Sequence, residues 1–154
     1  PTTEVVMLPD TVSAVLRRKN RKVIAIAPDA SVYDAISLMA ENSIGALLVV
    51  SNGILVGILS ERDYARKVVL QSRSSKDTPV CDIMATPVIT VTPAHTVEEC
   101  MRLMTDRRIR HLPVVEGDTI AGIVSIGDLV RSVITIQGET IQFLQEYIGG
   151  RYPG

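Results

Sequence analysis

The stretch Gly57-Ile58-Leu59-Ser60-Glu61-Arg62-Asp63 recurs 65 residues later as Gly122-Ile123-Val124-Ser125-Ile126-Gly127-Asp128. The same shift lays Val23–Val69 on Val88–Ile134 without a gap, and most aligned pairs are identical or exchange one apolar residue for another. Such self-similarity indicates one supersecondary unit made twice, with each copy covering apolar faces of the other. Equivalent polar groups of a duplicated unit tend to surround a pseudo-two-fold cleft. The repeated motif is therefore the first place to look for a site.

The repeat divides the chain into four parts. We expect a first repeat at residues 12–70, a linker at 71–79, a second repeat at 80–136 and a helical tail at 137–154. Each repeat has the pattern strand, helix, strand, strand, helix, preceded by a short helical segment, which predicts an α/β (α+β) fold of two βαββα units. The predicted strands are Val23–Ile26, Ala46–Val50 and Leu55–Leu59 in the first repeat, and Val88–Val91, Leu112–Val115 and Ile120–Val124 in the second.

Capping patterns mark the helix starts. Ser31 with Asp34, and Thr96 with Glu99, have the spacing of a capping box, in which the hydroxyl accepts the third residue's amide and the carboxylate reaches back. The second helix of each repeat follows Ser60 or Ser125. We expect its apolar residues to face inward: Tyr64, Ala65, Val68 and Val69 in the first repeat, and Leu129, Val130, Val133 and Ile134 in the second.

Composition excludes several kinds of protein. A net charge of −1 gives no general attraction to nucleic acid or to an anionic membrane, and 3% aromatic residues leave few rings for base stacking. No apolar run is long enough to span a bilayer and no secretion signal is recognised, so we expect a cytoplasmic protein. Cys81 and Cys100 lack metal-ligand spacing, and we expect no metal.

One local exception is the basic segment Arg17-Arg18-Lys19-Asn20-Arg21-Lys22. Its cations can simply be solvated before the first strand, or some of them can neutralise a bound phosphate. The sequence leaves both alternatives open.

The repeated Gly-x-x-Ser-x-x-Asp motif has two interpretations. A helix N-terminus with a serine hydroxyl suits a phosphate, and an aspartate one turn later can accept both hydroxyls of a ribose. Gly57 and Gly122 then leave room for the ligand. Alternatively, Ser-x-x-Asp is an ordinary helix cap, and a cap duplicates as readily as a site.

The paired motifs, the strands beginning at Ile44-Gly45-Ala46 and Ile109-Arg110-His111, and the segment Val80–Pro87 together resemble a tandem pair of cystathionine-β-synthase (CBS) domains over roughly residues 12–134. The resemblance implies two units packed through their sheets, a homodimer, and clefts between the repeats that bind AMP, ADP, ATP, NAD or S-adenosylmethionine.

The resemblance also implies which residues line each cleft. One cleft would join Ser125 and Asp128 to Val23, Ile24, Ile44, Gly45 and Ala46. The other would join Ser60, Arg62 and Asp63 to Val88, Ile89, Ile109, Arg110 and His111.

The two clefts are expected to differ. Arg62 precedes Asp63 and can contact phosphate, whereas Gly127 stands at the equivalent place before Asp128. Arg110, opposite Gly45 in the repeat, could reach phosphate in either cleft, and we favour this role because a guanidinium binds phosphate through two N–H groups. This favours AMP or a dinucleotide over S-adenosylmethionine. For His111 beside it, ligand binding and a structural place at a buried strand edge both stay open.

Three classes of function follow. We favour a regulatory adenine-nucleotide sensor in signal transduction that changes its dimer geometry and is recognised by an unidentified partner protein. A ligand-free dimerisation scaffold is the alternative. We do not expect an enzyme, since neither serine has a histidine at a suggestive spacing and neither motif brings paired carboxylates. Binding to nucleic acid ranks below these.

Overall fold

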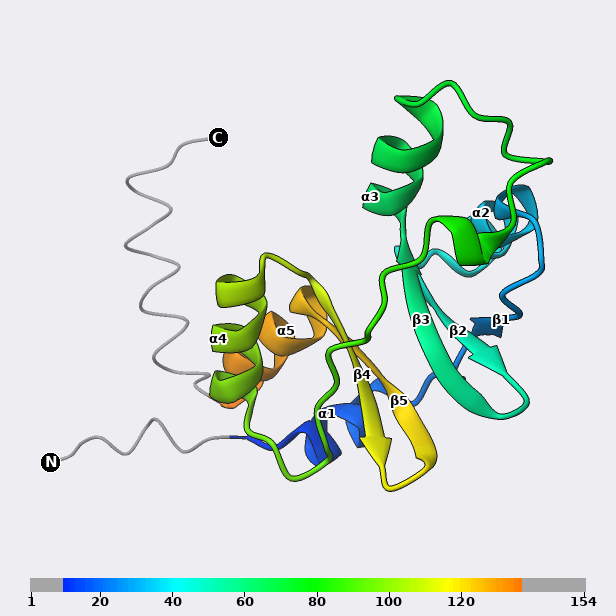
Figure 1. Cartoon of the computed structure of the whole chain (residues 1–154). Coiled ribbons are helices and arrows are strands. Elements are labelled where there is room, and N and C mark those ends of the chain that lie inside the picture. The colour runs from blue at the N-terminus through cyan, green and yellow to red at the C-terminus, as the bar shows by residue number, and fades with distance from the viewer. Residues whose placement is uncertain (1–9, 137–154) are drawn as a thin grey trace, which may run out of the picture. The chain divides into compact units, whose positions relative to one another are not determined.

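The computed structural model describes residues 10–136 (Figure 1). Its elements follow the predicted order closely. They are α1 (Val12–Lys19), β1 (Ala25–Ile26), α2 (Val32–Asn42), β2 (Ala46–Ser51), β3 (Ile54–Ser60), α3 (Glu61–Tyr64), the π-helix η2 (Ala65–Val69), the 3-10 helix η3 (Val80–Asp82), α4 (Val97–Arg107), β4 (His111–Glu116), β5 (Thr119–Ser125) and α5 (Ile126–Ile136). The predicted tail at 137–154 lies outside the described residues.

The described residues fall into two compact units. Unit 1 contains 10–20, 92–112 and 124–136, and unit 2 contains 21–91 and 113–123. The units do not follow the repeats one to one. α1 of the first repeat lies in unit 1, and residues 80–91 and 113–123 of the second repeat lie in unit 2.

Unit 2 is built on a three-stranded sheet in the order β1-β2-β3 (Figure 1). β1 runs parallel to β2, and β2 runs antiparallel to β3 with a bulge between Val49 and Val50. Ala46–Val49 is buried throughout, as expected for an apolar strand covered on both faces. The unit's core is formed by the buried residues Val32, Ala35, Met39, Leu47, Val49, Leu59, Val68, Val80 and Ile83.

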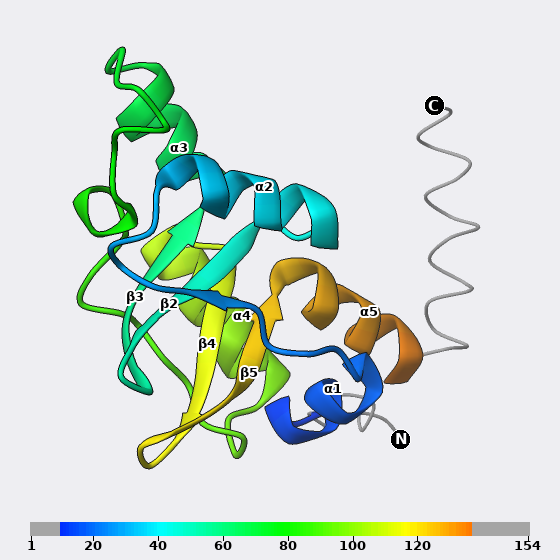
Figure 2. The same ribbon diagram turned by 90° about the vertical axis from the view of Figure 1, so that its right-hand side faces the viewer.

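Unit 1 is mainly helical. α5 packs against both α4 and α1, and the α1–α5 pair is visible in Figure 2. α4 begins with the predicted capping box, in which Glu99 N donates to Thr96 Oγ1 and Thr96 N donates to the Glu99 carboxylate. β4 and β5 form a two-stranded sheet whose residues are shared between the units.

The short helical segments at the start of the two repeats, α1 and η3, are called lead-in segments. Each is hydrogen-bonded to the other repeat, and both use the same bond pattern. Val12 N donates to His95 O and Ser13 N to Pro93 O, which fastens α1 to the turn before α4. In unit 2 the amides of Val80 and Cys81 donate to Ala30 O and Pro28 O, before α2. α1 thereby belongs structurally to the second repeat, and η3 to the first.

The first strand of the second repeat is shorter than predicted. Of Val88–Val91, only Val91 forms a bridge, parallel to Val114. Pro113 lies in the facing strand and has no amide to donate, which limits the ladder there. The corresponding strand of the first repeat, β1, has two residues.

The prediction of inward-facing residues in the second helices was partly wrong. Val68 and Leu129 are buried, but Ala65, Val69, Val130 and Ile134 are exposed. In the first repeat the helix widens into the π-helix η2, which changes the angular spacing of its side chains. In the second repeat Ser132 takes an inward position, because Asp10 and Arg18 satisfy its hydroxyl.

Candidate functional site: two Ser-x-x-Asp helix starts

The first motif forms a complete capping box at the junction of β3 and α3. Ser60 N and Ser60 Oγ each donate to Asp63 Oδ2 at 3.0 Å, and Asp63 N donates to Ser60 Oγ at 3.2 Å. Asp63 Oδ1 lies 3.4 Å from the ammonium of Lys67, one turn further along the helix. That separation is longer than a good hydrogen bond, so Oδ1 is weakly held.

The second motif has the same backbone pattern between β5 and α5. Ser125 N donates to Asp128 Oδ2 at 2.8 Å, and Asp128 N donates to Ser125 Oγ at 3.1 Å. Both aspartates therefore cap their helices, as the alternative interpretation predicted. Capping leaves open whether the same groups also bind a ligand.

The first helical amide in each motif has an internal partner. Glu61 N donates to Gly45 O at 3.0 Å, and Ile126 N donates to Arg110 O at 2.9 Å. These bonds join each motif to the strand start of its own repeat. Because the first and third amides are both engaged, fewer backbone donors remain for a phosphate than the motif suggested.

The carboxylates of Asp63 and Asp128 differ most clearly in the cations that contact them. Asp128 Oδ2 is 2.8 Å from Lys19 Nζ, and Asp128 Oδ1 accepts from Arg131 at 2.6 Å. The Asp128 side chain is 6% exposed, compared with 17% for Asp63. Burial opposes ionisation of Asp128, but Lys19 and the Ser125 bonds outweigh it and lower its pKa.

The sequence did not single out these two cations individually. Arg131 lies three residues after Asp128, a spacing that brings helix side chains together. Lys19 comes from α1, more than 100 residues earlier, and only its membership of the basic segment pointed to it.

Arg110 and His111 lie in unit 1 together with Asp128. Burial lowers the pKa of His111; the charges of Lys19 and Arg110 lower it further, while Asp128 opposes them. Arg110 is exposed and His111 is partly buried. The structure thus groups His111 electrostatically with the motif of its own repeat; its predicted pairing with Ser60 and Asp63 stays a prediction.

The predicted apolar walls are found in both units. Ile109 lies in unit 1, whereas Val23, Ile24, Ile44, Gly45, Ala46, Val88 and Ile89 lie in unit 2 with Ser60, Arg62 and Asp63. Val23 and Arg62 are exposed, Ala46 is buried, and the others are partly buried. The predicted combination of these walls with Ser125 and Asp128 joins residues of different units, and it stays a prediction.

The expectation that Gly57 leaves room for a ligand was wrong. A Cβ at this position would lie 2.4 Å from Met84 Sδ and 2.9 Å from Met84 Cγ, so Met84 fills the space. Gly122 is itself buried. Gly57 therefore makes room for Met84, which follows η3, to pack on β3.

Other chemistry is limited among residues 10–136. They contain no group of three or more histidine, cysteine, aspartate or glutamate residues placed to hold a metal ion. None of their helices is long and apolar enough to cross a membrane. Cys100 is buried, and burial together with Glu99 raises its pKa to about 11, which fits the predicted role of a small core residue.

Two capped helix starts at equivalent places in a duplicated βαββα unit agree with the CBS resemblance. The CBS domain family model matches the chain twice, at residues 12–70 and 80–135. The chain belongs to the CBS domain family. Its fold is that of a CBS pair.

Relatives agree with this assignment. The mitochondrial CBS domain-containing protein CBSX3 of Arabidopsis thaliana is 45% identical over 92% of this chain and 73% of its own length. A solved protein from Burkholderia ambifaria, described as a proposed signal-transduction protein with CBS domains, is 52% identical. The match covers 83% of this chain and 96% of that one, with a TM-score of 0.79.

A solved complex shows a ligand class in another member. The CBS domain pair of protein MJ0100, in complex with 5′-methylthioadenosine and S-adenosyl-L-methionine, is 26% identical with a TM-score of 0.71. The match covers 80% of this chain and 94% of that one. Both ligands of that relative contain adenosine.

Proposed function

We propose that this CBS pair is a regulatory module that binds an adenine nucleotide, AMP, ADP, ATP or NAD, and signals through a change in the geometry of a homodimer. The carrying observation is the pair of Ser-x-x-Asp helix starts, each with a buried or partly buried carboxylate next to a cation. The adenosine ligands of the MJ0100 CBS pair support the ligand class.

The chemistry suits a phosphorylated nucleoside. An ionised carboxylate accepts hydrogen bonds from the two hydroxyls of a ribose, and nearby ammonium and guanidinium groups neutralise phosphate. Lys19 and Arg131 contact Asp128, and Arg62 adjoins Asp63 in the chain. A phosphate carries more negative charge than the single carboxylate of S-adenosylmethionine and can accept from several of these cations at once, which favours a nucleotide.

We further propose that the module is not an enzyme. Ser60 and Ser125 cap helices, and their hydroxyls accept the amides of Asp63 and Asp128. Neither is hydrogen-bonded to a histidine that could activate it as a nucleophile. Incubation with each nucleotide followed by product analysis tests this: turnover that Ser60→Ala abolishes would contradict it.

The compartment stays open to test. We expect a cytoplasmic protein, but the name of the Arabidopsis relative places that protein in mitochondria. Localisation of the tagged protein in its own cells decides between these compartments.

A thermal-shift series tests ligand binding. AMP, ADP, ATP, NAD and S-adenosylmethionine are added separately at millimolar concentration. A ligand at 100 times its Kd stabilises the folded state by about 2.7 kcal/mol, so at least one nucleotide should raise the melting temperature clearly. No shift with any nucleotide would contradict the proposal.

The alternative is a ligand-free scaffold, and one observation favours it. Both oxygens of Asp128 already have protein partners, as a purely structural cap would. Mass spectrometry of small molecules released from freshly purified protein discriminates the two. A co-purified adenine nucleotide at stoichiometric amount contradicts the scaffold.

A further inference from the structure

One cation of the basic segment has a defined position. Lys19, the last residue of α1, lies with Nζ 2.8 Å from Asp128 Oδ2, and its side chain is 20% exposed. Solvent therefore reaches part of this ion pair. The sequence left two alternatives open for the basic segment, solvation and phosphate binding. Because Lys19 is paired with Asp128, it has to be considered separately from the other cations of the segment.

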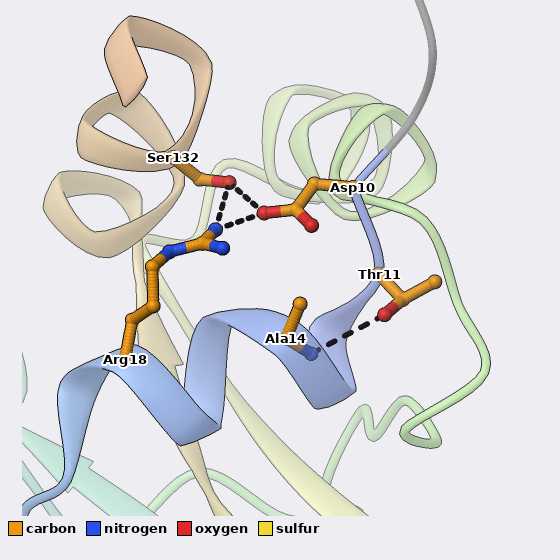
Figure 3. Close-up of polar contacts among 5 residues, drawn as sticks. All are labelled: Asp10, Thr11, Ala14, Arg18 and Ser132. Carbon is orange, nitrogen blue, oxygen red and sulfur yellow. Dashed lines mark hydrogen bonds and ion pairs between the residues drawn. The ribbon is translucent and has the colours of Figure 1, made fainter. Parts of the chain in front are cut away.

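The fold holds Lys19 in place from several sides. Thr11 caps α1 by accepting Ala14 N, and Val12 N and Ser13 N fasten its first turn to His95 O and Pro93 O. Near its end, Arg18 donates to Ser132 on α5 and pairs with Asp10 (Figure 3). These contacts fix the helix end next to α5, so the lysine reaches Asp128 without ordering a loop.

The described residues around the other motif are arranged differently. Its lead-in helix, η3, is three residues long, and the cation paired with Asp63 is Lys67, four residues later in η2, at 3.4 Å. Lys67 also donates to Ile83 O at 3.0 Å. The Asp128 motif thus lacks an arginine before its aspartate, but it receives a lysine from a separate element.

Several cations lie around Asp128. Lys19 and Arg131 both contact the carboxylate, and the charge of Arg110 reaches the neighbouring His111. The positive potential of these groups attracts an anionic ligand group. Lysine suits such a role because its flexible stem lets the ammonium exchange one oxygen partner for another.

We propose that Lys19 is the phosphate-binding cation of the Ser125–Asp128 motif, and that it exchanges the carboxylate for the ligand's phosphate when ribose hydroxyls bind Asp128. Neither group loses its partners in this exchange, since the ammonium keeps an anionic partner and the carboxylate gains two hydroxyl donors. This inference rests on the proposed nucleotide function and makes the Asp128 site selective for phosphorylated adenosine.

Calorimetric titration with AMP and with adenosine tests the role of Lys19. The full chain carries Asp63→Asn, which leaves the Ser125–Asp128 motif as the intact one. In this background AMP should bind at least about tenfold more tightly than adenosine, because a hydrogen bond to a charged group contributes about 1.5–3 kcal/mol. Adding Lys19→Met should remove that preference while adenosine affinity changes less than about threefold.

Two variants control for position and charge. Arg17→Met removes a neighbouring cation that makes an exposed bond to Ser13 within the described part of the chain, and it should keep the preference for AMP. Lys19→Arg retains a cation and should keep most of the preference for AMP. A preference for AMP that survives Lys19→Met, or an equal loss of AMP and adenosine, would overturn the role of Lys19 alone.

A measurement on the unsubstituted protein covers the case in which Lys19→Met fails to fold. In NMR spectra of the lysine Cε groups, the Lys19 signal should shift with AMP and not with adenosine. A shift of equal size with both ligands, or with neither although AMP binds, would contradict the exchange. If no adenine ligand binds the unsubstituted chain at all, the proposed function fails and this inference fails with it.

Discussion

Two glycines at the motifs have different physical surroundings. Gly57 lies against Met84, whereas a Cβ at Gly127 would meet Ser125 Oγ and Arg131 Nη1 only at 3.6 and 3.7 Å. The first position is closed to a methyl group, and the second is open. The sequence showed both glycines but gave no means of separating their roles, because the Met84 contact comes from the exchanged lead-in.

Gly57→Ala should therefore destabilise the protein by about 1–3 kcal/mol, the usual cost of overpacking. Gly127→Ala, near the start of α5, should be neutral or stabilise by up to about 1 kcal/mol, because alanine favours a helix over glycine. Urea unfolding measures both. In a Met84→Ala background the cost of Gly57→Ala should largely disappear; a cost that persists would show that Met84 is not its cause.

His111 should make stability fall in acid. Its folded-state pKa lies below the ordinary value of 6.5, so the unfolded chain binds the proton more readily. The resulting stability is complete well above pH 6.5 and is lost as the pH falls below it. His111→Gln should reduce the difference in unfolding free energy between pH 7.5 and pH 5.5. An unchanged difference in His111→Gln would contradict the assignment.

At the scale of elements, the sequence predicted most helices and strands within one or two residues. Their apolar patterns and caps are local signals, as at Thr96 and Glu99. The errors arose where tertiary contacts decide. Val88–Val91 became a single bridge opposite Pro113–Val115. In α5, Ser132 faces inward and bonds Asp10, just before α1, and Arg18 of α1 (Figure 3).

The Asp10–Arg18–Ser132 cluster should contribute more to stability than the exposed position of Arg18 suggests. Arg18→Ala removes bonds to a buried serine and to Asp10, and we expect a loss of about 1–2 kcal/mol in unfolding free energy. Arg17→Ala, one residue earlier, removes only an exposed bond to Ser13 and should cost less than about 0.5 kcal/mol. Equal effects of the two substitutions would show that the cluster does not fasten α1.

At the scale of the whole molecule, duplication predicted the fold but not the chemical difference between its two motifs. The sequence shows the shared pattern at Ser60 and Ser125, and it also shows that Arg62 has Gly127 at the equivalent position of the second repeat. The ion pair from Lys19 to Asp128 joins elements far apart in the chain, so no spacing rule reveals it. Lys19 reaches Asp128 because α1, at the start of the first repeat, is hydrogen-bonded to the second repeat.

The predicted homodimer can be tested through α5. Val130 and Ile134 lie one turn apart and are 43% and 42% exposed, so a partner helix could cover both. Sedimentation equilibrium should give about twice the chain mass of 16.7 kDa, and Val130→Asp should shift it toward the monomer. Ile54→Asp, at an exposed position on β3, should leave it unchanged. A wild-type mass other than the dimer would contradict the prediction.

Calorimetric titration of the full chain with AMP tests the central claim, that the two Ser-x-x-Asp helix starts are nucleotide sites. We expect two sites per chain, with one lost in Asp63→Asn and the other in Asp128→Asn. Both variants should remain folded, because the serine caps are retained and the asparagine amide oxygen can still accept the serine N–H. No binding by the unsubstituted chain, or two sites retained in either variant, would contradict it.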